Sequence, residues 1–166
     1  MQVESNKNLL LVEDEVLIAM GKQKELEKYG YIVQHVNTGE KAVALSVESK
    51  EIDLILMDID LGKGIDGTDA AALILEEHDI PIVFMSSHTE PEVVEKTERI
   101  TSYGYVVKNS SITVLDASIK MAFKLFKANK QITESGLIQK AMLSKISDVI
   151  GIIGTDSIMK YKSPNI

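Results

Sequence analysis

Short apolar runs alternate along this chain with longer stretches in which apolar residues recur every three or four positions. The runs cover residues 9–13, 32–36, 53–58, 81–86 and 104–108. Near-continuous apolar runs of this length are typical of strands that are buried on both faces of a parallel sheet.

The stretches between the runs carry helical spacing and helix boundary signals. They cover residues 16–28, 39–48, 68–78 and 91–100. Gly30 follows the first as a stop signal, and Thr38 and Thr89 are candidate N-caps. We therefore expect an α/β fold with a doubly wound, five-stranded parallel sheet of flavodoxin-like order 2-1-3-4-5.

Length and composition narrow the class of protein. The 166 residues, 45% of them hydrophobic, are enough for one substantial core plus an appendage. The net charge of −7 argues against a nucleic-acid surface, and the absence of cysteine excludes disulfides and thiolate metal sites. Because the start of the chain lacks a signal-peptide layout and no apolar stretch could cross a membrane, we expect a cytoplasmic protein without a membrane partner.

Charged residues follow three of the predicted strands. Glu13 and Asp14 end the first, Asp58 ends the third, and Lys108 ends the fifth. The carboxyl ends of parallel strands line one crevice, so these side chains should converge. Carboxylates brought together without histidine or cysteine favour Mg²⁺, and the ion would suit a phosphoryl group.

Asp58 also allows other interpretations. A single aspartate at a strand end is more often a cap or a turn former than a reactive group. Asp58 and Asp60 also form the Asp-x-Asp pattern of haloacid-dehalogenase-type phosphatases, although Gly62 and the third-strand position depart from it. A flavodoxin-like cofactor binder would share the sheet order, but Glu13 and its acidic neighbours would repel a flavin phosphate.

Five motifs, in order and at the usual spacing, resemble the receiver domain of two-component response regulators. They are residues 10–15 (LLVEDE), 56–59 (LMDI), 66–67 (DG), 81–87 (PIVFMSS) and 104–108 (GYVVK). The resemblance extends from about residue 7 to residue 127.

The resemblance implies an aspartyl-phosphate site. Asp58 would take a phosphoryl group from a phosphohistidine on a histidine kinase. Glu13 and Asp14 would hold Mg²⁺ together with Asp58 and the backbone carbonyl of Asp60. The domain would catalyse its own phosphorylation and dephosphorylation, without a kinase catalytic domain in the chain. A module that binds partners but is never phosphorylated is the main alternative.

Three further residues match positions with known roles in that family. Lys108 would pair with a phosphoryl oxygen, Ser86 matches the switch hydroxyl, and Tyr105 matches the aromatic switch residue. Receivers usually follow the lysine with a cis proline, but here Asn109 follows Lys108. A cis bond to a non-proline residue is costly, which favours a trans bond and a somewhat different aim of Lys108.

Beyond Lys108 an apolar stripe at alternating steps of three and four predicts a long helix. Its members are Ile112, Leu115, Ile119, Ala122, Phe126 and Asn129. The stripe is compatible with packing of this helix on the sheet and with coiled-coil pairing. The resemblance implies a homodimer through the fourth helix, fifth strand and fifth helix.

The end of the chain has a different pattern. Gly136 interrupts the helical spacing before it resumes at 137–146, and apolar runs around Thr155, Asp156 and Ser157 predict a β-hairpin. Residues 147–164 resemble the first hairpin of a PAS domain. We therefore expect a receiver domain at 1–130, followed at 131–166 by a linker helix and the start of a PAS domain, within a hybrid or PAS-containing sensory kinase.

Overall fold

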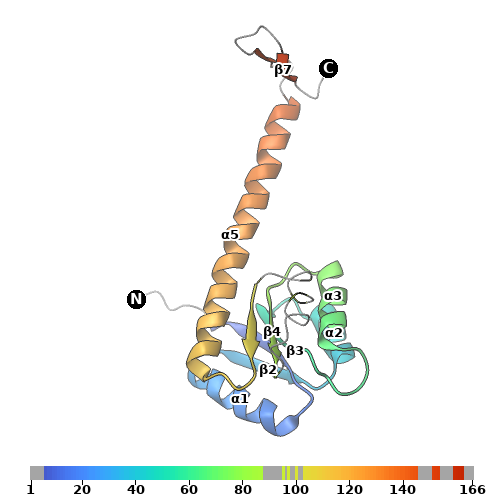
Figure 1. Ribbon diagram of the computed structural model, residues 1–166, viewed down its shortest axis with the longest axis vertical. Helices are drawn as coiled ribbons and strands as arrows, with labels where there is room; N and C mark the ends of the chain where they lie inside the picture. Colours follow the sequence, from blue (N-terminus) through green and yellow to red (C-terminus); the bar gives the residue numbers. More distant parts are fainter. Residues whose placement is uncertain are drawn as a thin grey trace. The chain divides into compact units, whose positions relative to one another are not determined.

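Five parallel strands form the central sheet of the computed structural model, in the order β2-β1-β3-β4-β5 (Figure 1). The strands are β1 (Asn8–Val12), β2 (Ile32–Val36), β3 (Leu54–Asp58), β4 (Ile82–Ser86) and β5 (Tyr105–Val107). The structure describes residues 6–87, 95, 97, 100, 103–145, 151–153 and 159–162. The sheet order and the strand positions confirm the fold expected from the apolar pattern.

Helices cover both faces of the sheet. They are α1 (Val16–Lys28), α2 (Gly39–Glu48), α3 (Gly67–Glu77) and α5 (Ile112–Lys145). Buried residues of α1 and α5 pack on one face, and those of α2 and α3 pack on the other, which makes the sheet doubly wound (Figure 1). The helix expected at 91–100 and its cap Thr89 lie largely outside the described residues.

Both layers of the core depend on alternate side chains of the same strands. Leu9 and Leu11 face the α1 and α5 side, whereas Leu10 and Val12 face the α2 and α3 side. Every residue of β3 and β4 is buried, as expected for central strands of a parallel sheet. The rigid centre of the sheet therefore places the end of β3, and Asp58 with it.

Side-chain caps begin two of the helices. The Thr38 hydroxyl accepts a hydrogen bond from the Lys41 amide at 3.2 Å, as predicted. Asp66 caps α3 in the same way, by accepting from the Asp69 amide at 2.9 Å.

Gly67 is required for close packing and not for a left-handed backbone. Its φ lies outside the positive range that Gly30, Gly62 and Gly64 adopt. A Cβ at Gly67 would overlap the backbone carbonyl oxygen of Asp58. The start of α3 therefore packs directly against the end of β3.

The apolar stripe of α5 packs against the sheet. Leu115, Ile119 and Ala122 are buried in the core, and Ile112 packs against the same cluster. The sheet covers these residues, so the packing interpretation holds for them, whereas pairing of helices through the exposed end of the stripe at Asn129 stays a prediction. The helix also continues without a break through Gly136, since a single glycine weakens a helix by only about 1 kcal/mol.

The chain divides into two compact units, Met1–Phe126 and Lys127–Ile166. In the second unit β6 (Gly151–Ile153) and β7 (Met159–Lys162) pair in an antiparallel hairpin, as predicted. The predicted turn at 155–157 lies outside the described residues.

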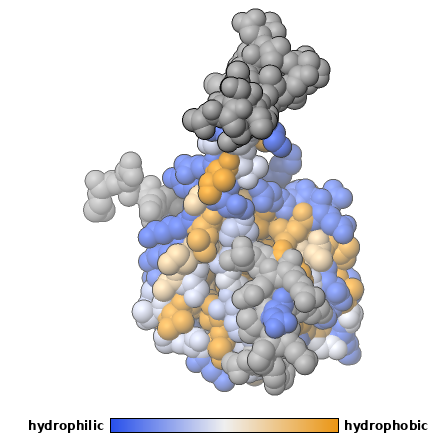
Figure 2. Space-filling model, turned by 45° about the horizontal axis from the view of Figure 1, so that its top comes forward, coloured by the Kyte–Doolittle hydropathy of each residue, from blue (hydrophilic) through white to orange (hydrophobic). Residues whose placement is uncertain are grey.

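The surface of the first unit mixes polar and apolar residues. Figure 2 shows hydrophobic residues scattered among hydrophilic ones on the face that it draws. Within the described residues, no helix has the length and apolar character that crossing a membrane requires.

Candidate functional site

Three carboxylates meet at the carboxyl edge of the sheet. Glu13 and Asp14 follow β1 directly, and Asp58 is the last residue of the adjacent strand β3, with Val12 paired to Met57. One oxygen from each of the three carboxylates lies within 4.8 Å of the others. The structure thus brings together the acidic residues that the sequence indicated as metal ligands.

Two of these carboxylates are inaccessible to solvent. Glu13 and Asp58 are both 0% exposed, whereas Asp14 is partly exposed. Charged groups are rarely buried to this extent unless they are paired or bind a metal ion. This burial separates the cluster from ordinary surface acids.

Lys108 reaches the cluster from the end of β5. Its Nζ atom donates to Asp58 Oδ2 at 2.6 Å and to Glu13 Oε1 at 3.1 Å. The Lys108 amide donates to the Ser86 carbonyl at 2.9 Å, which extends the pairing of β4 and β5 to the lysine. The described residues contain no cis peptide bond, so Lys108 reaches Asp58 with a trans bond to Asn109.

Ser86 lies on β4, which is beside the strand that ends in Asp58, and Tyr105 lies on β5, one strand further out. Ser86 is the last residue of β4, is fully buried, and belongs to the same edge as Asp58. Tyr105 is paired with Phe84 and packs against the core on the α2 and α3 side. Their positions are compatible with the switch roles that the sequence suggested, and both residues already have interaction partners.

The loop after β3 donates a backbone hydrogen bond to Asp58. The Asp60 amide donates to Asp58 Oδ1 at 3.1 Å, so each oxygen of Asp58 accepts a hydrogen bond. The carboxylate is therefore held in one orientation before any ligand arrives.

Burial and charge shift the pKa values of the central pair. Burial, aided by the nearby Glu13 charge, raises the pKa of Asp58 to about 6, although hydrogen bonds from Lys108 and Asp60 oppose the shift. Burial by itself would lower the pKa of the Lys108 ammonium, but Asp58 and Glu13 outweigh it and leave that pKa raised. Lys108 therefore stays charged at neutral pH beside a carboxylate that is poorly stabilised as an anion.

The chemistry of the donors fits a hard divalent cation. The ligand set contains only carboxylate oxygens, which suit Mg²⁺. Glu13 Oε2 is buried and has no hydrogen-bond partner among the described residues. Gly62 leaves space beside Asp14, because a Cβ there would lie 2.7 Å from Asp14 Oδ2. A buried oxygen without a hydrogen bond and an uncrowded carboxylate are features of a site that can accept an ion.

Sequence reasoning missed Lys22. This residue lies on α1 with Ala19 and Leu26, which are both buried, and its Nζ atom is 3.9 Å from Glu13 Oε2. Burial lowers the pKa of the Lys22 ammonium, while the Glu13 charge opposes this. A lysine where the helical pattern of 19, 22 and 26 calls for an apolar residue is the signal that could have revealed it.

His35 supports the cluster from β2. Its Nε2 atom lies 2.8 Å from the Glu13 carbonyl oxygen, so the ring is hydrogen-bonded to the backbone of a candidate ligand.

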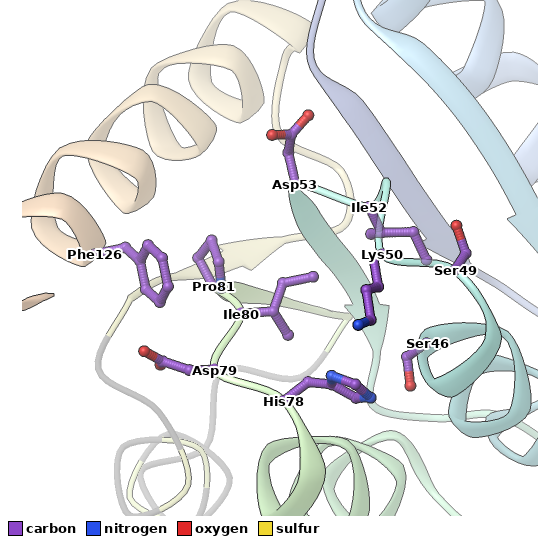
Figure 3. Close-up of a pocket in the computed structure, with 10 residues that line it drawn as sticks. All are labelled: Ser46, Ser49, Lys50, Ile52, Asp53, His78, Asp79, Ile80, Pro81 and Phe126. Carbon is purple, nitrogen blue, oxygen red and sulfur yellow. The ribbon is translucent and has the colours of Figure 1, made fainter.

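A pocket of about 300 Å³ lies at the opposite edge of the sheet (Figure 3). Asp53 and Pro81, which directly precede β3 and β4, belong to its lining together with Phe126 of α5. The Asp53 carboxylate accepts hydrogen bonds from the Lys7 ammonium and from the Asn8 amide. The pocket is thus separate from the carboxylate cluster, which lies at the other ends of the same strands.

Comparison with known families and proteins gives a consistent result. A family model described as the response regulator receiver domain matches residues 9–120. The transcriptional regulatory protein PdtaR of Mycobacterium tuberculosis is 34% identical over 122 residues, which is 73% of this chain and 58% of that protein. The phyllosphere-induced regulator PhyR of Methylorubrum extorquens is 36% identical over 83 residues, or 49% of this chain and 31% of that protein. The chain therefore spans well under two thirds of the length of these relatives.

Solved structures show the same fold. The N-terminal domain of a response regulator/sensory box/GGDEF 3-domain protein from Carboxydothermus hydrogenoformans is 45% identical, with a TM-score of 0.69, covering 74% of this chain and 98% of that chain. The signal receiver domain of a modulated diguanylate cyclase from Desulfovibrio desulfuricans is 32% identical, with a TM-score of 0.68, covering 75% and 98%.

Proposed function

The chain belongs to the response regulator receiver domain family, and we propose that Asp58 accepts a phosphoryl group from a histidine kinase. Receiver domains take phosphate from histidine kinases in two-component systems. The observation that carries the proposal for Asp58 is its fully buried carboxylate, which is 2.6 Å from a lysine ammonium and within 4.8 Å of two further carboxylates.

The transfer exchanges one bond for another. A carboxylate oxygen of Asp58 attacks phosphorus, the new P–O bond forms, and the P–N bond to the kinase histidine breaks with its electron pair remaining on the imidazole nitrogen. Negative charge accumulates on the phosphoryl oxygens during this step, and the nearby ammonium of Lys108 would stabilise it. Hydrolysis of the aspartyl phosphate by water then returns Asp58 to its resting state.

Glu13, Asp14 and Asp58, with the backbone carbonyl of Asp60, are the groups that would hold Mg²⁺. When bound, the ion neutralises charge on the phosphoryl group. The orphaned oxygen of Glu13 and the space at Gly62 support this assignment. Lys108 balances part of the negative charge of the cluster from the side of β5.

Ser86 and Tyr105 would change position when Asp58 is phosphorylated and so transmit the change to other parts of the domain. β4 pairs with β3, which ends in Asp58, and β5 pairs with β4, so the positions of the two residues support a route from the site through β4 to β5 and then to α5. A fourth helix in the region 91–100 and the α5 face would complete the surface through which the domain forms a homodimer or contacts partners.

The setting of the domain is part of the proposal. Residues 131–166 would be a linker helix and the start of a PAS domain in a PAS-containing or hybrid sensory kinase that works in the cytoplasm. The antiparallel hairpin of β6 and β7 supports this arrangement, as does the sensory box that follows the response regulator in the name of the Carboxydothermus protein.

The test uses acetyl phosphate as the donor. We expect the protein with Mg²⁺ to gain one phosphoryl group in intact-mass spectra and Asp58→Asn to gain none. Asp53→Asn is the matched control, because Asp53 also pairs with a lysine but lies at the other edge of the sheet. Full labelling of Asp58→Asn would refute the assignment. Failure of the parent protein to label would favour a pure interaction module, and continuous release of inorganic phosphate without labelling would favour a phosphatase.

A further inference from the structure

The carboxylate cluster has more negative charge than Lys108 alone balances. Lys108 donates to Glu13 Oε1 and Asp58 Oδ2, and these two contacts leave Glu13 Oε2 without a hydrogen bond among the described residues. Glu13 is 0% exposed, so water does not reach its side chain freely. A buried carboxylate oxygen in this state is destabilising unless a cation lies nearby.

Lys22 supplies that second cation from α1. Its Nζ atom lies 3.9 Å from Glu13 Oε2, which is an ion pair but is too long for a hydrogen bond. The side chain of Lys22 is only 13% exposed. Side chains of a helix lean towards its N-terminus, and the start of α1 directly follows Glu13 and Asp14, so a lysine on this face reaches back to the cluster.

Packing gives no reason for a charge at this position. Ala19 and Leu26, one turn before and one turn after Lys22 on the same face, are both completely buried in the core. An ammonium beside them loses hydration, and that loss is offset by the charge of Glu13. The contact with Glu13 is therefore the feature of the structure that explains a lysine here.

We propose that Lys22 is a tethered counter-ion that competes with the divalent cation for Glu13. In the metal-free protein its ammonium balances the buried carboxylate. When the divalent cation binds, it takes over this role and the flexible lysine side chain turns away towards solvent. The long separation of the pair favours this exchange, because no hydrogen bond has to be broken at Oε2. The inference rests on the proposed metal site at Glu13, Asp14 and Asp58.

Competition of this kind predicts a change in metal affinity with a definite sign. A positive charge beside the ligands weakens the binding of a divalent cation, so its removal should tighten binding. We expect Lys22→Met to bind Mg²⁺ about tenfold more tightly than the parent protein, which corresponds to about 1.4 kcal/mol. Lys22→Arg keeps the charge and should bind within about twofold of the parent, a difference of less than about 0.5 kcal/mol.

Mg²⁺ titrations followed by amide chemical shifts give the affinity without any phosphorylation step. Lys24→Met is the matched control, because it removes the same charge from an exposed position of the same helix. Its affinity should remain within about twofold of the parent. Unchanged or weaker binding by Lys22→Met, or equal tightening by Lys24→Met, would overturn the inference.

Thermal unfolding separates competition from a purely structural role. Without metal, Lys22→Met should melt below the parent, because Glu13 has lost a counter-ion, and saturating Mg²⁺ should remove most of this difference. A structural role alone would lower the melting temperature by the same amount with and without Mg²⁺. If Lys22→Met does not fold, Lys22→Gln, which keeps a polar end, provides the same two readouts.

The titration also separates this inference from the proposal beneath it. Asp14→Asn should abolish the Mg²⁺-dependent shifts. If the parent protein itself shows no saturable shifts, the metal site is wrong. If the parent binds Mg²⁺ and loses it in Asp14→Asn, but Lys22→Met binds no more tightly, only the role of Lys22 is wrong.

Discussion

Two lysine–aspartate pairs lie at opposite edges of the same sheet, and they differ in burial more than in distance. Lys108 and Asp58 are 2.6 Å apart with side chains 11% and 0% exposed, whereas Lys7 and Asp53 are 2.9 Å apart and 45% and 29% exposed. Among the residues that the structure describes, only the buried pair has two more carboxylates beside it. Similar residues therefore give a buried charge cluster at one edge and a solvent-exposed ion pair at the other.

The difference teaches that burial, and not the identity of the paired residues, decides how strongly the charges interact. Solvent screens the Lys7–Asp53 pair, and exposed pairs contribute only about 0–1 kcal/mol to stability. At the other edge the sheet excludes water, so the charges act strongly on one another and on any ligand. Each of the following experiments asks how far this contrast holds.

The largest expected effect is on the rate of phosphorylation. Lys108→Met should lower the rate of labelling by acetyl phosphate by about 100-fold or more, because a preorganised cation beside the transferring group is lost. Lys7→Met should change it by less than about twofold. Rates from intact-mass time courses at fixed Mg²⁺ test this, and equal effects of the two substitutions would remove the contrast between the edges.

The next effect concerns the packing beneath the carboxylate cluster. Gly67→Ala should destabilise the first unit by about 2–3 kcal/mol, since its Cβ would overlap the carbonyl oxygen of Asp58. Gly21→Ala is the control, because nothing lies within 4 Å of a Cβ at this position of α1. That variant should be more stable by about 0.5–1 kcal/mol. Urea unfolding measures the stability of both variants. A Gly67→Ala variant with unchanged stability would show that the loop after β3 can shift to make room for the Cβ.

A third test uses pH on the metal-free protein. The pKa of Asp58 is raised to about 6, above the usual value of 3.8, so the folded state binds this proton more tightly than the unfolded state. The contribution of Asp58 to stability is therefore favourable at low pH and is lost as the pH rises from about 4 to 6. Asp58→Asn should be more stable than the parent by about 2 kcal/mol above pH 7, and this advantage should shrink towards pH 4.

Urea unfolding at a series of pH values provides the measurement. Asp53→Asn, at the solvated edge, serves as the control for replacing an aspartate that is paired with a lysine. A difference between Asp58→Asn and the parent that is constant from pH 4 to 8 would contradict the cause assigned to the shift.

The smallest effect is expected at the solvated edge. Lys7→Met removes an exposed ion pair and the contact of its ammonium 5.3 Å from the centre of the Phe123 ring. The loss in free energy of unfolding should be at most about 1 kcal/mol, and it should decrease at high salt. A larger loss that persists in salt would mean that this pair, too, is shielded from water.

Much of the fold could be predicted because the signals were local. Buried parallel strands are continuous apolar runs, so their positions could be recognised from the sequence, and the acidic residues at the ends of β1 and β3 indicated where a site would form. The α5 stripe was ambiguous because packing on a sheet and pairing of helices demand the same spacing. Only the tertiary structure shows that Leu115 and Ile119 are already covered.

The features that could not be predicted depend on contacts that exist only in the folded structure. Lys22 contacts Glu13 through a long side chain that extends back along α1, and no motif connects the two residues. Gly67 is needed because of a close approach to Asp58, which its neighbours in sequence do not reveal. The continuation of α5 through Gly136 reflects the small cost of one glycine in an otherwise helical segment.

The position of β5 has a consequence for the dynamics of the domain. This strand has three residues, lies at the end of the sheet order and pairs with β4 alone among the described strands, yet it leads directly into Lys108. Edge strands have few hydrogen bonds to lose, so they open locally at a lower free energy than the centre of a sheet. Amide hydrogen exchange should therefore be faster at Val106 and Lys108 than at Leu56 and Met57, and each opening would withdraw the lysine from Asp58 while the rest of the sheet stays folded.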